Sequence, residues 1–433
     1  MKNAIIICAT LAFVALAVYD LMLLSGHFLT TKNVGAGRIW HGLVRWGTPI
    51  GEGEVHCPNG NVYRGEWQDG GIHKGHLTTS KYEYDGKFKD WKLHGFGIAR
   101  YKNGHTYIGN WRENRKEGLG RYEYNNAENH VSFGVWKEGI LPIDTTQMVY
   151  HTSDKVYGID VSRYQGIINW ETLYFQADKT GKIPAKESNG NCLLPVYFAI
   201  MKATEGANYQ DPTYSYNIEN ARRCGVIVGA YHFLNSKSTA EEQAKNFIDH
   251  AKLTRGDLPP VLDIEIHDSI MRREGDRIRQ LALDWLDIIE RHYHVRPIIY
   301  TYHNFRLRHI DARFARYDTW IAHYAIPQPK VEEWRLWQFT IAPHIGGHQN
   351  NIDLNVFNGN YRQFKEYVNT HGIQTLNDRY AALFCQIFFK NKAQIQPRFT
   401  NKPSVGRKYA RFFAFCNPLN TNIIHKKANI NHP

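Results

Sequence analysis

Short apolar runs alternate with amphipathic segments between residues 156 and 357. The apolar runs are Val156–Val161, Val196–Lys202, Val226–Phe233, Pro260–Ile266, Pro297–Tyr302, Thr319–Tyr324, Arg335–Thr340 and Ile352–Phe357. Their length is that of buried strands, and helical patterns separate the first five. One helical pattern begins with a predicted capping box at 238–241, and another carries an apolar stripe from Ile278 to Ile288. Eight strands alternating with helices predict an α/β barrel.

The last three runs lie closer together than the others. Only about ten to twelve residues separate them, which is too short for full crossover helices. We therefore expect the final part of the barrel to be irregular.

A different pattern, with a repeat, precedes the barrel. Aromatic-x-Gly-x-aromatic units occur at 63–67, 84–88 and 107–111, with degenerate copies around Gly42 and at 133–136. The pairs Gly51/Gly53, Gly95/Gly97 and Gly118/Gly120 lie between these units. Alternating aromatics predict strands, and the glycines suit turns or bulges, so each unit predicts a short hairpin. One hairpin cannot bury its own aromatic face, so we expect the hairpins to stack.

These units resemble the MORN repeat (membrane occupation and recognition nexus). They depart from its pattern after Gly75, where Leu77 replaces the second glycine. The resemblance leaves two interpretations open. The repeats are either a rigid spacer and docking face, or a surface that binds lipid or glycan.

The two ends of the chain differ in composition from both patterned regions. Residues 1–30 contain an apolar stretch interrupted only by Asp20, which predicts an export signal or, as we favour, an uncleaved membrane anchor. Residues 37–141 hold the repeats, 142–155 read as a polar linker and 156–372 hold the barrel. Residues 373–433 lack periodicity and predict a basic, disordered tail.

The charge distribution argues against a nucleic-acid partner. The net charge is +12, but residues 374–433 alone supply +9. The remainder of the chain is therefore close to neutral and lacks a basic surface for nucleic acid. The six cysteines show no C-x-x-C spacing, and the sequence contains no H-E-x-x-H motif. We expect no metal and no cofactor.

Acidic residues interrupt the apolar strands at three places. Residues 259–267 read as one buried strand, in which Asp263 and Glu265 share a face with Cα atoms ~7 Å apart. Two carboxyl groups at this spacing suit work on a glycosidic bond. Asp160 follows from the first strand and Asp353 from the last, and these strands are neighbours in a barrel. We therefore expect four carboxyl groups around one mouth.

Residues 156–370 resemble glycoside hydrolase family 25, the N-acetylmuramidases or Chalaropsis-type lysozymes. The matching segments are Asp160-Val161-Ser162 with Gln165-Gly166, Lys202-Ala203-Thr204-Glu205-Gly206, Gly229-Ala230-Tyr231-His232-Phe233, Leu262-Asp263-Ile264-Glu265, Trp337-Gln338 and Asp353-Leu354-Asn355. The resemblance implies a TIM-like barrel with five βα units followed by three strands. It also implies hydrolysis of the β-1,4 bond between N-acetylmuramic acid and N-acetylglucosamine in peptidoglycan.

The resemblance and the residue chemistry give the acids the same roles. Glu265 is expected to have a pKa raised by its charged neighbour and to act as general acid. Asp263 is expected to stay ionised, and either to stabilise the oxocarbenium-like transition state or to orient the substrate's 2-acetamido group. Asp160 and Asp353 would position substrate and tune these pKa values.

Further candidates for substrate binding flank the acids. They are Tyr164, Gln165, Glu205, Tyr231, His232, Tyr300, Tyr324 and Trp337. An aromatic face suits the apolar face of a pyranose, although the same rings also suit a core. Glu205 suits a structural ion pair with Lys202 equally well. His232 suits a buried hydrogen bond equally well.

The sequence thus predicts an exported peptidoglycan hydrolase of the cell envelope, membrane-anchored, periplasmic or secreted. Its expected partners are peptidoglycan and, through residues 1–30, a membrane. Two rival hypotheses remain: a catalytically silent glycan-binding or scaffolding protein, and a hydrolase of chitin-like polymers. The sequence leaves the oligomeric state open.

Overall fold

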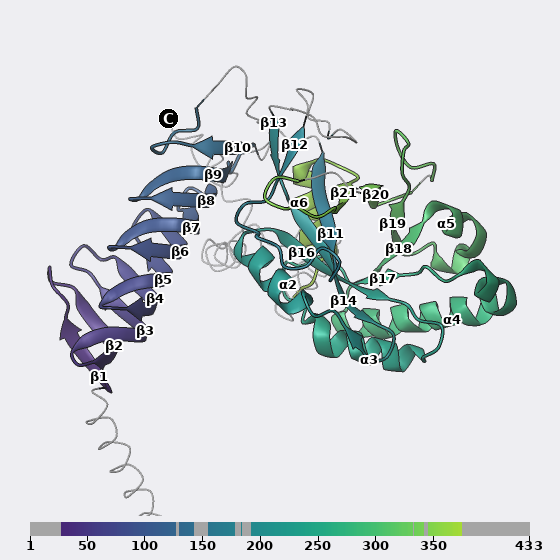
Figure 1. Cartoon of the computed structure of the whole chain (residues 1–433), viewed down its shortest axis with the longest axis horizontal. Helices are drawn as coiled ribbons and strands as arrows, with labels where there is room; N and C mark the ends of the chain where they lie inside the picture. The colour runs from purple at the N-terminus through teal and green to yellow at the C-terminus, as the bar shows by residue number, and fades with distance from the viewer. Residues whose placement is uncertain are drawn as a thin grey trace, which may run out of the picture.

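The chain forms a ten-stranded antiparallel sheet beside a closed eight-stranded barrel (Figure 1). This computed structural model describes residues 27–126, 130–142, 155–177, 183, 192–331, 333–341 and 345–374. The sheet strands are β1 (His27–Asn33), β2 (Ile39–Arg45), β3 (Thr48–His56), β4 (Val62–Gln68), β5 (Gly71–Thr78), β6 (Tyr82–Lys89), β7 (Lys92–Tyr101), β8 (Thr106–Arg112), β9 (Arg115–Glu123) and β10 (Val131–Trp136). They follow one another in chain order, so every connection is a hairpin.

One row of glycines crosses this sheet from β2 to β10. Its members are direct cross-strand partners: Gly42, Gly53, Gly65, Gly75, Gly86, Gly97, Gly109, Gly120 and Gly134. Large rings lie over the row, and a Cβ on Gly86 or Gly97 would collide with the Tyr84 ring. Aromatic side chains take the space of a Cβ at Gly42, Gly53, Gly86, Gly97, Gly109 and Gly120, and backbone atoms of the neighbouring strand take it at Gly65 and Gly75.

The first glycine of each G-x-G pair has a different purpose. Gly51, Gly95 and Gly118 have φ values of 64°, 65° and 75°, in the left-handed region that glycine adopts without strain. The aromatic face buries Trp40, Tyr84, Tyr107 and their neighbours as one core. The hairpin stack predicted from the repeats is thus observed.

The barrel consists of β11 (Val156–Val161), β14 (Phe198–Glu205), β16 (Ile227–Phe233), β17 (Val261–Asp263), β18 (Ile298–Tyr302), β19 (Asp318–Ala322), β20 (Leu336–Ile341) and β21 (Asp353–Phe357). It closes because β11 pairs with both β14 and β21. All eight predicted strands are present. However, β21 runs antiparallel to both of its neighbours, so the barrel is not the all-parallel TIM type.

The described helices lie outside the barrel or across one end of it. They are α2 (Tyr214–Arg223), α3 (Ala240–Ala251), α4 (Asp268–Tyr293), α5 (His303–His309) and α6 (Tyr361–His371), with a 3-10 turn, η1, at Ala312–Phe314. The capping box of α3 is formed by Thr239 and Glu242, one residue later than predicted. Phe364 of α6 contacts the rings of Phe198 and Phe357, so α6 closes one end of the barrel interior.

Two parts of the barrel differ from the expected five βα units. The described residues between β11 and β14 contain a hairpin of β12 (Tyr174–Ala177) and β13 (Cys192–Pro195) and no helix. Helical crossovers therefore follow only β14, β16, β17 and β18 in the described chain. In addition, β17 ends at Asp263, so Ile264, Glu265 and Ile266 lie beyond the strand.

The sheet packs directly on the barrel. Arg121 of β9 is buried, pairs with Glu123, and donates a hydrogen bond of 3.0 Å to the backbone oxygen of Gly225 after α2. Tyr361 of α6 donates to Glu123 at 2.9 Å, and Lys87 of β6 pairs with Glu171 at 2.7 Å. These contacts form an interface between the sheet and the barrel.

The predicted anchor within residues 1–30 lies mostly outside the described residues, and β1 begins at its end. Nearly all of the predicted tail, from residue 375 on, also lies outside them. Within the described ranges, no helix has the length and hydropathy that crossing a membrane requires.

Candidate active site

Asp160 and Asp353 face each other across two paired strands. They are register partners, Asp160 near the end of β11 and Asp353 at the start of β21. Because β21 is antiparallel, its first residue lies at the same rim as the last residues of β11. The convergence expected for this pair is therefore observed, through an antiparallel strand.

A hydrogen-bond network holds the Asp160 carboxylate. Its Oδ2 accepts from Gln338 Nε2 at 2.9 Å and from Asn355 Nδ2 at 2.7 Å. Gln338 Oε1 in turn accepts from the Tyr300 hydroxyl at 2.9 Å and from the Tyr324 hydroxyl. These contacts fix Asp160 in one orientation on the barrel interior.

Asp263 ends β17, and Glu265 follows it in the loop. Asp263 is 6% exposed, and its Oδ1 has no hydrogen-bond partner among the described residues. Since the strand stops at Asp263, the strand alternation used to place both acids on one face does not extend to Glu265. The pKa of Asp263 is raised by burial and, as the second cause, by the charge of Glu265.

Burial raises the pKa of all four acids. It is the largest cause for Asp160, Asp263 and Glu265, and it raises the pKa of Asp353 to about 6. The charge of Asp353 adds to the raised pKa of Glu265, while Tyr300 and Lys202 lower it. The raised pKa expected for Glu265 is present, although its main cause is burial. The expectation that Asp263 stays ionised is not supported, because its own pKa lies well above the usual value.

Lys202 of β14 brings a positive charge to this end of the barrel. Its Nζ lies 2.6 Å from Glu205 Oε2, and its charge lowers the pKa of Asp263 and of Glu265. Glu205 therefore has the ion pair with Lys202 that the sequence allowed.

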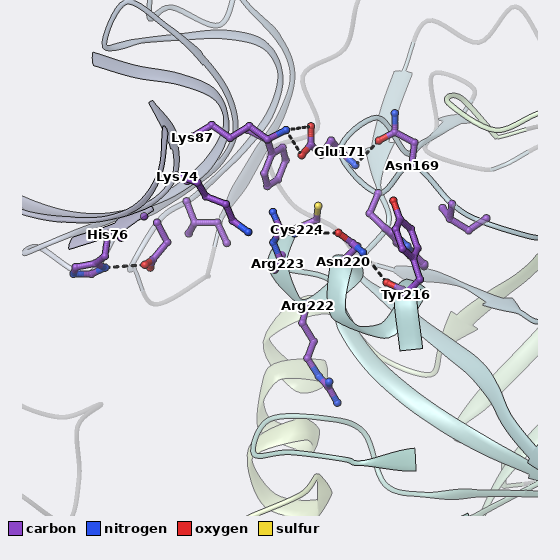
Figure 2. A pocket seen from close by; sticks show the side chains of 18 of the residues that line it. Lys74, His76, Lys87, Asn169, Glu171, Tyr216, Asn220, Arg222, Arg223 and Cys224 are labelled. Atoms are coloured by element: carbon purple, nitrogen blue, oxygen red, sulfur yellow. Dashed lines mark hydrogen bonds and ion pairs between the residues drawn. The ribbon is translucent and has the colours of Figure 1, made fainter. Parts of the chain in front are cut away.

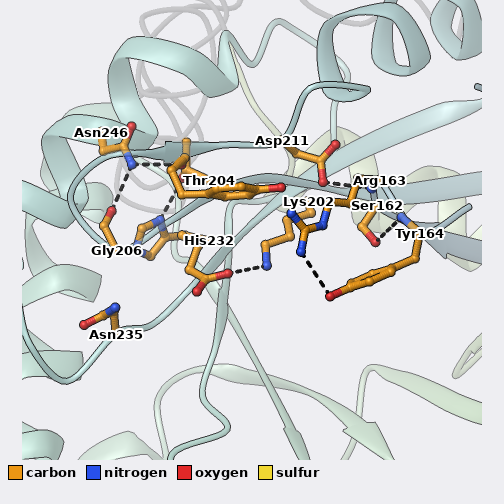
Figure 3. Close-up of polar contacts among 12 residues, drawn as sticks. Ser162, Arg163, Tyr164, Lys202, Thr204, Gly206, Asp211, His232, Asn235 and Asn246 are labelled. Carbon is orange, nitrogen blue, oxygen red and sulfur yellow. Dashed lines mark hydrogen bonds and ion pairs between the residues drawn. The ribbon is translucent and has the colours of Figure 1, made fainter. Parts of the chain in front are cut away.

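His232 does not face the barrel mouth, and its assignment to substrate binding is wrong. Its ring is fully buried between β16 and α3, with Nδ1 2.7 Å from Thr204 Oγ1 (Figure 3). Its Nε2 lies 3.1 Å from Gln243 Oε1. It also stacks on Trp285 of α4. Strand alternation explains this placement, because Tyr231, the residue before it, interacts electrostatically with Asp263 and Asp160 instead.

Trp337 is misassigned for the same reason. Its neighbour Gln338 points inward to Asp160, so Trp337 points to the outer layer, where its Nε1 donates to the backbone oxygen of His323 at 2.7 Å. Tyr300 and Tyr324 contact Gln338, so these two rings do lie at the site.

Tyr164 and Gln165 lie on the loop that follows β11. Tyr164 is 73% exposed, and the Arg163 guanidinium contacts its hydroxyl at 3.3 Å (Figure 3). Gln165 Oε1 accepts from the Ser162 backbone at 2.9 Å, which makes Gln165 part of the loop structure. An exposed, oriented ring at the rim suits stacking on a sugar.

Sequence reasoning missed two amides, Gln338 and Asn355, and the indole of Trp320. Trp320 donates to Asn355 Oδ1 at 2.8 Å, and Gln338 and Asn355 are cross-strand partners. Asn355 stands two residues after Asp353, and so on the same face of β21. That spacing was a usable signal for a polar group beside the acids.

The barrel part of the chain is similar to several known proteins. Residues 159–348 match the model of the family Glycosyl hydrolases family 25. The uncharacterized protein YegX of Escherichia coli K12 is 31% identical over 232 residues, which are 53% of this chain and 79% of YegX. Lysozyme M1 of Streptomyces globisporus is 33% identical over 219 residues, 47% of this chain and 68% of that protein. A bacterial lysozyme structure from Streptomyces coelicolor shares 30% identity, covering 50% of this chain and 98% of that one, with a TM-score of 0.42.

Proposed function

The chain belongs to glycosyl hydrolases family 25, and we propose that it is an N-acetylmuramidase that cleaves peptidoglycan at the β-1,4 bond between N-acetylmuramic acid and N-acetylglucosamine. The observation that carries this proposal is the buried Asp263 Oδ1, which lacks a partner among the described residues and belongs to a group of four acids. A buried acceptor without a donor is costly unless a ligand supplies one.

Glu265 is the proposed general acid. Its pKa is raised by burial, which favours the protonated form that a general acid needs. The proton passes from the Glu265 carboxyl to the glycosidic oxygen as the bond to the anomeric carbon breaks. The remaining carboxylate then accepts a proton from the attacking water.

Asp263 is proposed to orient the 2-acetamido group of the sugar. The acetamido N–H is a donor of the kind that the free Oδ1 of Asp263 lacks. Held in this way, the acetamido oxygen can attack the anomeric carbon as the bond to the leaving oxygen breaks. Asp160 and Asp353 would keep the opposite wall of the site polar and position the substrate.

Digestion of purified peptidoglycan tests the proposal. The new reducing ends should be N-acetylmuramic acid, measured by borohydride reduction and mass spectrometry of the products. Reducing-end N-acetylglucosamine, or the release of chitin oligomers from chitin at a comparable rate, would contradict it. A Glu265→Gln variant serves as the control for contaminating hydrolases.

For the remaining organisation, we propose a MORN-type module at 37–141, a linker at 142–155 and the catalytic barrel at 156–372. The register of the glycine row supports the repeat assignment. A peptidoglycan substrate implies export to the cell envelope, with residues 1–30 as signal or anchor. Fusion of residues 1–30 to a reporter enzyme that is active only outside the cytoplasm tests this part.

A further inference from the structure

A groove of about 950 Å³ separates the repeat sheet from the barrel (Figure 2). Strands β3 to β7 line one side. The loop after β11, from Ile167 to Glu171, and helix α2 line the other. None of the four acids at the barrel rim lines this groove, so it is separate from the candidate active site.

The sheet face toward the barrel changes character along its length. Near the barrel it carries Phe96, Ile108 and Phe133, which line the contact with the barrel. Farther away, the corresponding positions carry Arg64 and Lys74, which line the open groove. The docked part of this face is thus mostly apolar, with Arg121 as its buried charge, whereas charged side chains predominate along the open groove.

Cations outnumber acids on the groove walls. The lining contains Arg64, Lys74, Lys87, Arg100, Arg222 and Arg223 against Glu52, Asp85 and Glu171. Four of these cations are neutralised, since Arg64 pairs with Glu54, Arg100 with Asp85, Lys87 with Glu171 and Arg222 with Asp257.

Two cations remain without an acidic partner among the described residues, Lys74 of β5 and Arg223 of α2. The Arg223 guanidinium donates a hydrogen bond of 3.2 Å to the neutral amide of Asn220. Figure 2 shows Lys74 and Arg223 extending into the gap from opposite walls. Such a pair is a suitable receptor for carboxylate groups.

One short loop of the chain links the groove to the active-site mouth. Tyr164 stands at the mouth, and Ile167, 56% exposed, lines the groove three residues later. Three residues span at most ~11 Å. Tyr216 of α2, 48% exposed, also lines the groove, so apolar surface accompanies the cations.

We propose that this groove binds the carboxylate-bearing peptide stems of a glycan strand whose sugars occupy the barrel mouth. The proposal rests on the muramidase function given above, because only a peptidoglycan strand presents sugars and acidic peptides together. Lys74 and Arg223 would hold peptide carboxylates, while Ile167 and Tyr216 contact the aliphatic parts of the stem. The repeat sheet is then part of the substrate-binding surface.

Kinetics on matched substrates test the proposal. The double variant Lys74→Glu/Arg223→Glu is compared with wild type and with Lys81→Glu, an exposed residue of the same sheet that does not line the groove. Soluble glycan strands are used with their peptide stems and after enzymatic removal of the stems. We expect KM on peptide-bearing strands to rise roughly 10-fold in the double variant, with kcat unchanged. Lys81→Glu should have the wild-type KM on both substrates. On stem-free strands, the double variant should also have the wild-type KM.

Two results would overturn the proposal. An unchanged KM on peptide-bearing strands means that the groove does not bind stems. An equal rise on both substrates means that it binds the sugar backbone instead. If the charge reversals unfold the protein, Lys74→Gln/Arg223→Gln replaces them, with the same criteria.

A separate measurement distinguishes this proposal from the muramidase function. Fluorescence anisotropy with a labelled free stem peptide reports binding without catalysis, and the double variant should weaken it to the same extent. If wild type cleaves neither strand but binds the stem peptide through Lys74 and Arg223, the muramidase function fails while the groove assignment stands. If wild type cleaves both strands but does not bind the stem peptide, the muramidase function stands and the groove assignment fails.

Discussion

Asp353, the first residue of β21, is the direct cross-strand partner of Asp160 on β11. The charge of Asp353 raises the pKa of Asp160 and also that of Glu265. Burial is the largest cause of both shifts, and the antiparallel last strand, in addition to closing the barrel, adds a charge that further raises the pKa of the proposed general acid.

Removing the charge of Asp353 should change the pH profile. In Asp353→Asn the pKa of Glu265 should fall, so the proposed acid loses its proton at a lower pH. The alkaline limb of kcat/KM should then move to lower pH. Asp284→Asn, on the exposed face of α4, should leave the limb in place. An alkaline limb of kcat/KM at the same or a higher pH in Asp353→Asn would show that Asp353 does not raise the pKa of Glu265.

Asp353 should also make stability depend on pH. Burial raises its pKa to about 6 from 3.8, so the folded protein binds this proton more tightly than the unfolded chain. Stability gained in this way is present below about pH 4 and is lost as pH rises through 6. Asp353→Asn should therefore become more stable relative to wild type on going from pH 4 to pH 7, by about 1 kcal/mol. Urea unfolding of both proteins at pH 4 and pH 7 measures this change. The same difference in unfolding free energy between variant and wild type at the two pH values would contradict the prediction.

Glu265→Gln should remove the proposed proton donor and keep its shape. Turnover on peptidoglycan should fall ~10²-fold or more, with little change in melting temperature. Glu241→Gln, at the exposed start of α3, is the matched control and should keep full activity. Wild-type turnover in Glu265→Gln would exclude Glu265 as the acid.

Arg121→Ala should loosen the interface between sheet and barrel. The arginine is buried, pairs with Glu123 and lies over the Tyr197 ring, so its loss removes the close charge partner of Glu123 and the hydrogen bond to Gly225, and leaves Glu123 with Tyr361 and, at 3.9 Å, Lys365. We expect a loss of about 3 kcal/mol in unfolding free energy. Arg115 lies in the same strand as Arg121 and forms an exposed ion pair with Glu138. Arg115→Ala breaks this pair and should lower the unfolding free energy by less than about 1 kcal/mol. Chemical denaturation measures both, and equal losses would mean that Arg121 does not stabilise the interface.

The glycine row can be tested at one position. A Cβ at Gly97 collides with the Tyr84 ring, so Gly97→Ala should destabilise the sheet by about 2 kcal/mol. In Gly71→Ala the nearest atom to the new Cβ is a backbone oxygen at 3.9 Å, and little change is expected. Thermal unfolding of the two variants gives the comparison, and similar melting temperatures would argue against a steric reason for the row.

The eight barrel strands were predictable because each is an apolar run of strand length. The direction of the last strand was not predictable, because a short connection between strands does not specify an antiparallel pair in a barrel. The residue spacing placed Asp160 and Asp353 together correctly. The same reasoning misplaced His232 and Trp337. A barrel strand is buried on both faces, so the sequence alone does not show which face points into the barrel interior.

The docking of the sheet on the barrel was also beyond the sequence. Phe96, Ile108 and Phe133 read as further hydrophobic positions of the repeats, although they contact the barrel. A repeat pattern reports the contacts that each unit shares with its neighbours. The pattern carries no information about contacts that only some of the units make with another domain.

The row of glycines has a consequence for how this protein can change over evolution. Each strand adds one glycine and its neighbours add the covering ring, so a duplicated hairpin would fit the stack without altering any existing contact. One duplication would lengthen the charged wall by about 9.5 Å, twice the spacing between strands. Under the groove proposal, the number of hairpins determines the length of the surface that is available to a glycan strand, without any change in the catalytic barrel.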